Sequence, residues 1–144
     1  MDQLSPHPSW KCVEEALAAM GVQRLTPKDF GLLENSGVKS VQIVWGQNAP
    51  EAKVTITRVT VQPSSTQARH SHDHAEQIWL VERGTATLLL ADDETAHMHE
   101  GEVVRTPAGD IHGIINTGSE AFVYLAITTP PQDFSAAYRQ SKRT

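Results

Sequence analysis

The sequence has little of several features that would narrow the class of the protein. It contains 144 residues but a single cysteine, Cys12, so no internal disulfide can form. No apolar run approaches the length that crosses a membrane, and no basic region followed by an apolar stretch opens the chain. We therefore expect a soluble cytoplasmic protein that needs no oxidising compartment.

Charged residues, and clusters of basic residues in particular, are also scarce. Only 20% of the residues are charged, the formal net charge is −5, and no basic cluster occurs before the tail at Lys142 and Arg143. Partners such as nucleic acid or an anionic membrane are bound by basic faces, so we expect neither. A hydrophobic fraction of 39% in a chain of this length indicates one globular domain with its own core.

Short β-patterned segments fill the middle of the chain, and turn residues rather than helices join them. They span residues 38–45, 52–61, 77–82, 85–90, 96–99, 102–105, 111–116 and 121–128. Short strands at this spacing predict an antiparallel all-β sandwich or barrel rather than a βαβ fold.

Helices are predicted on both sides of this β-patterned region. After a potential cap at Ser9, apolar residues recur at helical spacing and predict an N-terminal helix: Trp10, Val13, Leu17 and Met20. We expect residues 22–37 to be a turn-rich connection. After Pro130 and Pro131, a short helix over 134–139 is expected, capped near Asp133 and pinned by Phe134 and Tyr138. We divide the chain into an extension (1–37), a barrel (38–129) and a tail (130–144).

Six of the seven histidines lie between residues 70 and 116. His70 and His72 are two apart, and side chains at that spacing point the same way only on a strand. An imidazole from a neighbouring strand, His112, and an oxygen from Glu76 or Gln77 would complete a mixed nitrogen and oxygen site. Such a ligand set suits a divalent first-row transition metal.

Two segments resemble the motifs of the cupin superfamily. The second motif, G-x5-P-x-G-x2-H-x3-N, is matched at each fixed position, by Gly101, Pro107, Gly109, His112 and Asn116. The first motif, G-x5-H-x-H-x(3,4)-E-x6-G, is matched by His70, His72 and Gly84, but Ser64 replaces its first glycine. The resemblance covers roughly residues 53–128.

This resemblance implies a cupin jelly-roll barrel, also called a double-stranded β-helix, with the predicted helices at its two ends. It implies that His70, His72, His112 and either Gln77 or Glu76 hold Fe, Mn, Ni, Zn or Co, and that the barrel receives a small organic molecule. Cupins are commonly dimers, and the apolar N-terminal stripe with strand 38–45 offers more apolar surface than one barrel must cover. We therefore expect a homodimer.

The identity of the fourth ligand depends on which residue faces the barrel. Six residues separate Gln77 from Gly84, as in the motif, whereas seven separate Glu76 from it. A tight hairpin at Gly84 would place Gln77, Trp79 and Val81 on the inner face, and a bulge near the turn would bring Glu76 inward instead. We predict Gln77, which leaves the protein part of the site without charge.

The remaining polar residues of interest are expected outside the metal site. We place His74 at the rim and His97 and His99 on a solvent-facing strand, far in sequence from a carboxylate partner. We expect exposed arginines at strand positions 58, 69 and 105, while Trp79 and Tyr124 pack in the core or line a pocket.

Function follows less directly than fold, since one fold hosts many activities. The leading hypothesis is a mononuclear metalloenzyme of oxygenase, isomerase or lyase type acting on a small organic molecule, in which the metal polarises a carbonyl. The alternative is a non-catalytic cupin that binds or senses a small molecule. An acid or base beside an open metal position would favour the enzyme, and a closed ligand shell or an apolar pocket would favour binding.

Overall fold

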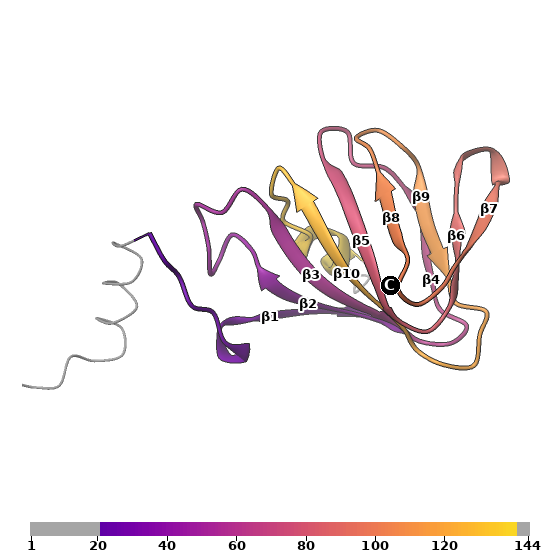
Figure 1. Cartoon of the computed structure of the whole chain (residues 1–144), viewed down its shortest axis with the longest axis horizontal. Helices are drawn as coiled ribbons and strands as arrows, with labels where there is room; N and C mark the ends of the chain where they lie inside the picture. The colour runs from indigo at the N-terminus through magenta and orange to yellow at the C-terminus, as the bar shows by residue number, and fades with distance from the viewer. Residues whose placement is uncertain (1–20, 141–144) are drawn as a thin grey trace, which may run out of the picture.

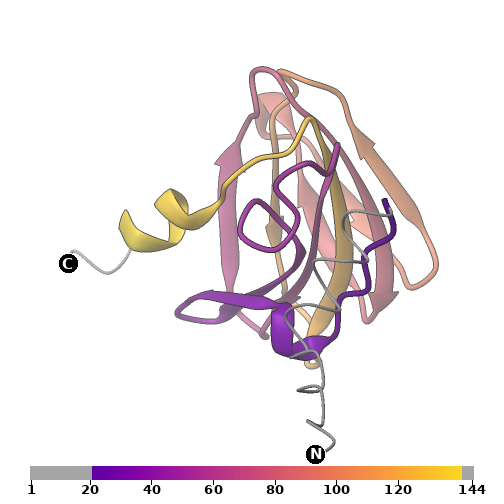
Figure 2. The same ribbon diagram turned by 90° about the vertical axis from the view of Figure 1, so that its left-hand side faces the viewer.

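The computed structural model describes residues 21–140, which form two antiparallel β-sheets that face each other (Figures 1 and 2). Its strands are β1 (Gly31–Asn35), β2 (Val38–Val44), β3 (Thr55–Val61), β4 (Thr66–His70), β5 (Glu76–Arg83), β6 (Ala86–Leu89), β7 (Thr95–Met98), β8 (Val103–Thr106), β9 (His112–Ile115) and β10 (Phe122–Thr129). Two short 3-10 helices, η1 (Pro27–Asp29) and η2 (Ala91–Asp93), and the helix α2 (Ser135–Gln140) complete the described chain.

The larger sheet has the order β1-β2-β3-β10-β5-β8 and the smaller one β4-β9-β6-β7. All the described strand pairs are antiparallel, which confirms the predicted all-β jelly roll. Within residues 21–140, no helix is both long enough and apolar enough to cross a bilayer.

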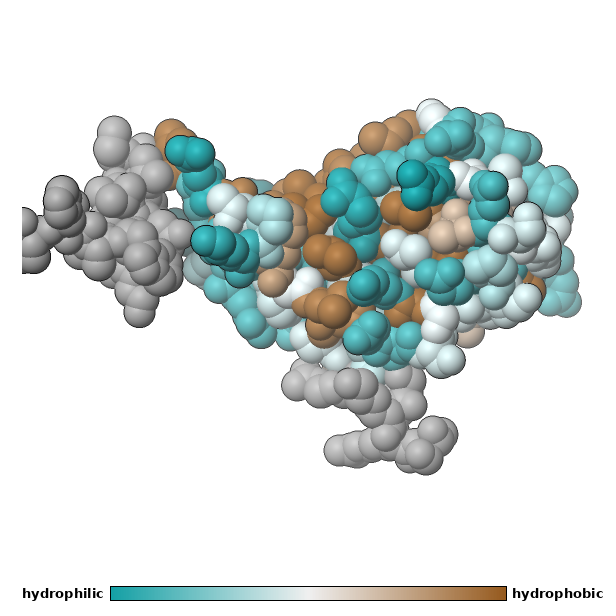
Figure 3. Space-filling view, turned by 90° about the horizontal axis from the view of Figure 1, so that it is seen from below, coloured by the Kyte–Doolittle hydropathy of each residue, from teal (hydrophilic) through white to brown (hydrophobic). Residues whose placement is uncertain are grey.

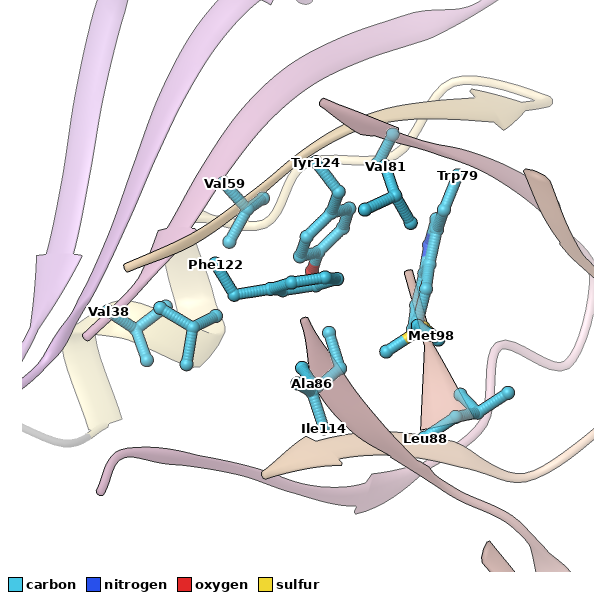
Figure 4. Close-up of a cluster of buried hydrophobic side chains, with 12 residues drawn as sticks. Val38, Val59, Trp79, Val81, Ala86, Leu88, Met98, Ile114, Phe122 and Tyr124 are labelled. Carbon is cyan, nitrogen blue, oxygen red and sulfur yellow. The ribbon is translucent and has the colours of Figure 1, made fainter. Parts of the chain in front are cut away.

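The core lies between the two sheets and is built by strict alternation. Along β3 and β10 every second side chain is buried, so each strand sends one row inward and one row outward. The inward rows meet in one cluster (Figure 4), which includes Val38, Val59, Trp79, Val81, Ala86, Leu88, Met98, Ile114, Phe122 and Tyr124. The same alternation therefore decides which polar side chains reach the barrel interior.

The interpretation of residues 22–37 as a turn-rich connection was partly wrong. Gly31–Asn35 forms β1, which pairs with β2 across a turn at Gly37, whose φ is +79°. The segment Gly-Leu-Leu-Glu-Asn buries none of its residues fully and has no β-branched side chain, so its pairing with β2, not its pattern, makes it a strand. The predicted N-terminal helix, with Trp10 and Cys12, and His7 lie outside the described residues. The division at residues 37 and 129 remains a prediction.

The corner at Gly84 also differs from expectation. We predicted a tight hairpin between two paired strands, but β5 belongs to the larger sheet and β6 to the smaller one. Gly84 adopts φ +78°, and a Cβ there would lie 2.6 Å from the Ala121 carbonyl oxygen, so glycine lets the chain cross from sheet to sheet. The register between β5 and β10 shifts next to this corner, beyond Val81, and the alternation from Gln77 to Val81 is unaffected.

The C-terminal helix is present at the predicted place. The Ser135 N–H donates to Asp133 Oδ1 at 2.9 Å, as expected of a residue that caps the first turn. Phe134 lies edge-on to His72, with ring centroids 5.8 Å apart, and Tyr138 packs against the core cluster. The segment from Phe134 to Tyr138 thus borders the histidine end of the barrel.

Candidate metal centre

Three histidines that are distant in sequence meet at one end of the barrel. His70 ends β4, His72 follows two residues later, and His112 begins β9. His70 and His112 are direct partners in the antiparallel pairing of β4 with β9. Their ring centroids are 4.5 Å apart, and the centroid of His72 lies 5.1 Å from that of His70 and 5.2 Å from that of His112. The predicted juxtaposition of the three imidazoles is confirmed.

Each of these rings offers a nitrogen to a common point. One ring nitrogen from each histidine lies within 4.8 Å of the others. Nitrogens bound to one ion at about 2.1 Å lie no more than about 4.2 Å apart, so closing on an ion needs only small ring rotations. His72 Nε2 and His112 Nε2 are buried and have no hydrogen-bond partner. Buried polar atoms are nearly always paired, so these two fit metal ligands whose ion completes them.

Backbone carbonyls fix the proton on the opposite nitrogen in two of the rings. His70 Nδ1 lies 2.7 Å from the Ala68 carbonyl oxygen, and His112 Nδ1 lies 3.1 Å from that of Asp110. A carbonyl can only accept, so Nδ1 carries the hydrogen and Nε2 keeps its lone pair. Metal-bound histidines are oriented in this way.

Burial also favours the neutral form of two of the rings, His72 and His112. It lowers the pKa of His112 to about 4, with the neighbouring His70 and His72 adding to the shift. Burial likewise lowers the pKa of His72, helped by His70 and opposed by Asp73. Neutral imidazole is the form that binds a metal, so at neutral pH protons compete only weakly with a metal ion for these nitrogens.

A turn in the second motif anchors the first. Gly109, in a left-handed conformation with φ +84°, donates its N–H to the His72 carbonyl oxygen at 2.9 Å. His72 lies beyond the end of β4, where no strand pairing holds it. The glycine turn before β9 therefore supplies the backbone contact that places the second histidine beside the third.

The two candidates for the fourth ligand point in opposite directions. Gln77 is 6% exposed and lines the same cavity as His70 and His72, whereas Glu76 pairs with Arg105 on the outer face. Gln77 Oε1 accepts from Trp79 Nε1 at 3.1 Å, and its Nε2 donates to Thr128 Oγ1 at 3.0 Å. The oxygen keeps a second lone pair, so coordination by Gln77 remains a prediction.

His70 and His72 open into a cavity of about 430 Å³ between the two sheets. Across this cavity, from β10 of the larger sheet to β4 of the smaller one, the Tyr124 hydroxyl donates to Gln67 Oε1 at 2.9 Å. Gln67 and Ser40 also hydrogen-bond the Tyr138 side chain from α2. Sequence reasoning placed Tyr124 here and missed Gln67 and Ser40, since a strand glutamine or serine carries no signal of its own.

This cavity holds few ionisable groups. Burial raises the pKa of Tyr138, against the effect of its hydrogen bonds to Ser40 and Gln67, and raises that of Tyr124 far above its usual range. Both phenols therefore keep their protons at neutral pH. Among the described residues that line the cavity there is no carboxylate, and the only strong cation is Arg69.

The other polar residues lie where the sequence placed them, with one correction. His74 and His97 are exposed, and so are the arginines at positions 58, 69 and 105. His99 is exposed too, but it does have a carboxylate partner: its Nδ1 lies 3.2 Å from Glu102 Oε1. We expected no carboxylate near this hairpin arm, but the turn at Gly101 brings Glu102 back to His99, and the Glu102 N–H donates to the His99 carbonyl oxygen at 3.1 Å. A larger open depression of about 710 Å³ beside Gly84 contains none of the histidines.

Comparison with known proteins supports the assignment of the fold. The family model of the cupin domain matches residues 57–128. A mannose-1-phosphate guanylyltransferase of Sinorhizobium fredii is 30% identical over 74 residues, which are 51% of this chain and only 14% of that protein. The chain thus spans a small part of the curated relative that it matches.

Solved structures with the same fold include proteins of different kinds. An ectoine synthase from P. lautus superposes with a TM-score of 0.65 at 7% identity, covering 76% of this chain and 75% of its own. A Cupin 2 conserved barrel domain protein from Salinispora arenicola superposes with a TM-score of 0.60 at 23% identity, covering 84% and 96%. These likenesses establish the fold and leave the activity open.

The lowered pKa of His112 predicts a pH-dependent stability of the metal-free protein. Between pH 6.5 and about 4 the unfolded chain takes up a proton that the folded His112 refuses. Its contribution to the free energy of unfolding is therefore complete above pH 6.5 and is lost as the pH falls toward 4. Urea titrations of the metal-free protein at several pH values should show this loss, and it should shrink in His112→Asn. An equal loss in that variant would contradict the assignment.

Proposed function

The chain belongs to the cupin family, and we propose that it holds one divalent first-row transition metal with His70, His72 and His112 and acts on a small organic molecule. The observation that carries the proposal is the pair of buried Nε2 atoms without a partner, on His72 and His112. Packing alone would leave both nitrogen atoms without a partner at a cost in stability, whereas a bound ion would complete them. Fe, Mn, Ni, Zn and Co all suit this ligand set.

Gln77 is our proposed fourth ligand. It is the inward residue of the pair at 76 and 77 and shares the cavity with two of the histidines. With three neutral imidazoles and an amide, the protein contributes no charge to the site. A bound ion would act there as a Lewis acid on an oxygen atom of the substrate.

The charge of the site indicates the class of ligand. The protein does not neutralise the ion, so the ligand should bring an anionic oxygen, as a carboxylate does. Apart from the histidines and Arg69, whose Nε donates to the Leu90 carbonyl oxygen, the cavity wall offers neutral hydrogen-bonding groups: Gln67, Tyr124 and Tyr138. Both phenols keep their protons, and because Tyr124 donates its own to Gln67 Oε1, its oxygen is left to accept from a hydroxyl of the ligand. The helix α2 borders the same cavity through Ala137 and Tyr138. We propose a small carboxylate with neutral polar substituents.

A specific observation favours the alternative, a cupin that binds its ligand without converting it. Among the described residues of the cavity, no carboxylate is present as a general base, and the buried phenols resist deprotonation. Metal-loaded protein incubated with a panel of small carboxylates separates the two readings. Turnover supports the enzyme, and calorimetric binding without any change in the carboxylate supports the binding protein.

Elemental analysis tests the metal itself. We expect one transition-metal ion per chain after mild purification, lost in His72→Ala and retained in His74→Ala. His74 is the matched control because it is an exposed histidine two residues away. Loss of a ligand should weaken binding by at least about tenfold. No stoichiometric metal in the wild type, or equal content in the two variants, would refute the proposal.

The fourth ligand is tested by a pair of variants titrated with Zn²⁺. We expect Gln77→Ala to lose about tenfold or more in affinity and Glu76→Ala to bind like the wild type. Gln77→Glu keeps the size of the side chain, adds a charge and should bind more tightly, which separates coordination from the packing lost in Gln77→Ala. Weaker binding only in Glu76→Ala would mean that the strand presents the other face to the metal.

We also propose a homodimer formed through the outer face of the larger sheet, and a cytoplasmic location, since a chain with one cysteine needs no oxidising compartment. Leu80 and Val103 are register partners on that face and are 42% and 61% exposed. Figure 3 shows hydrophobic residues gathered in the middle of one surface of the molecule, among hydrophilic ones. Large apolar side chains exposed side by side on a sheet face, as Leu80 and Val103 are, favour an interface.

Light scattering after size exclusion tests the dimer. Leu80→Asp should convert a dimer into a monomer without changing the metal content, because Leu80 points away from the cavity. Thr60→Asp, also outward but between Lys39 and Val123 rather than beside Val103, should remain dimeric. A wild type that elutes as a monomer at micromolar concentration would contradict the proposal.

A further inference from the structure

The strand that carries the first histidine does not keep regular alternation. In the pairing of β4 with β9, Gln67 lies opposite Ile114 and His70 lies opposite His112. Three steps along β4 therefore match two steps along β9, so Ala68 and Arg69 together face the single residue Gly113. This is a β-bulge with one extra residue.

The bulge decides which way His70 points. Gln67 faces the barrel, since its Oε1 accepts from the buried Tyr124 hydroxyl. Residues 67 and 70 would lie on opposite faces of a regular strand. Yet His70 also faces inward, with its ring 4.5 Å from that of the buried His112. The extra residue turns the His70 side chain inward, and His72, two residues further on, points to the same side.

Gly113 is the residue that leaves room for this bulge. A Cβ at position 113 would lie 2.8 Å from the Gln67 carbonyl oxygen and 2.9 Å from the Arg69 amide nitrogen. Both atoms are backbone, so neither can move aside as a flexible side chain could. The φ of Gly113 is not in the left-handed region, so backbone conformation does not require glycine here. The requirement comes from the close approach of the bulged strand.

Two further contacts hold the bulge in place. The Arg69 Nε donates to the Leu90 carbonyl oxygen at 2.7 Å, although β9 lies between β4 and β6 in the sheet. Arg69 therefore reaches over β9 near Gly113, where Leu89 and Gly113 are register partners and no side chain stands in the way. The Ala68 carbonyl accepts from His70 Nδ1, so the bulge also sets the tautomer of that histidine.

We propose that Gly113, through the bulge at Ala68 and Arg69 that it accommodates, is a positioning residue that turns His70 and His72 toward the metal. The proposal rests on the proposed function for its metal. Without the bulge, β4 pairs one to one with β9, so that Arg69 faces His112 and both His70 and His72 turn outward. Alanine ordinarily suits a strand better than glycine, so a purely local view would expect Gly113→Ala to be neutral or stabilising.

The experiment measures Zn²⁺ affinity by calorimetry in three variants. Gly113→Ala should bind about 10- to 100-fold more weakly than the wild type, the range seen when a group that orients a metal ligand is lost. Gly46→Ala is the matched control and should bind normally, because nothing lies within 4 Å of a Cβ there and its φ is not positive. In the third variant, Ala68 is deleted from Gly113→Ala.

Deletion of Ala68 supplies the sharpest test. It removes the extra residue, so Gln67, Arg69 and His70 pair one to one with Ile114, position 113 and His112, and His70 still points inward. The double variant should therefore recover affinity to within about tenfold of the wild type. If Gly113→Ala fails to fold, recovery of fold and affinity in the double variant gives the same support. Wild-type affinity in Gly113→Ala, or no recovery in the double variant, overturns the proposal.

A second readout needs no metal and separates this proposal from the proposed function. The His70 and His112 rings should show a nuclear Overhauser effect in the metal-free wild type, since their centroids are 4.5 Å apart. The effect should be absent in Gly113→Ala and return in the double variant. If the wild type binds no Zn²⁺, the proposed function fails and this comparison alone decides the role of Gly113. An undiminished effect in Gly113→Ala overturns that role.

Discussion

A β-strand can offer a side chain to the barrel interior only at every second residue, and the whole site depends on where that alternation holds and where it breaks. On β5 it holds from Gln77 to Val81, so an amide, an indole and an aliphatic side chain line the interior. On β4 it breaks at Ala68 and Arg69, and the break brings His70 to the same side as Gln67. One regular strand and one irregular strand therefore build the two walls beside His112.

The consequence for chemistry is a site without protein charge. Burial keeps His72 and His112 neutral, and the carboxylate beside Gln77 in the sequence, Glu76, is held outside by Arg105. The charge of a divalent ion is then left for a ligand to balance, while the phenols of Tyr124 and Tyr138 remain hydrogen-bond donors. Because Phe134, just before α2, lies beside His72 and Tyr138 of α2 hydrogen-bonds Gln67, the C-terminal segment belongs to the cavity and does not merely end the chain.

Much of this arrangement could be predicted from local patterns. The spacing of His70 and His72 and the match of His112 to a motif brought the three rings together, and the count back to Gly84 selected the inward residue. The count selected the inward residue although Gly84 is a corner between sheets and not a hairpin turn. It did so because side chains alternate regularly along β5 from Gln77 to Val81. The same count would have failed had the register shift lain before Val81.

The features that could not be predicted are those set by contacts between strands. Neither His70 nor Gln67 indicates in the sequence that β4 contains a bulge. Gly113 indicates it only weakly, since glycine occurs in strands for many other reasons. Strand β1 exists because β2 pairs with it, and the contact of His99 with Glu102 exists because the chain turns at Gly101. Pairing of this kind depends on the whole sheet, and a single sequence read strand by strand does not contain it.

We propose that His70 on β4, His112 on the adjacent β9 and His72 just beyond β4 share one metal ion, and X-ray absorption spectroscopy of the purified, metal-loaded protein tests this most directly. The account predicts a first shell of nitrogen and oxygen at about 2.0 to 2.2 Å, with outer-shell scattering that fits three imidazole rings. A spectrum that fits without imidazole scattering, or with a single ring, would show that the ion sits elsewhere and would contradict the account.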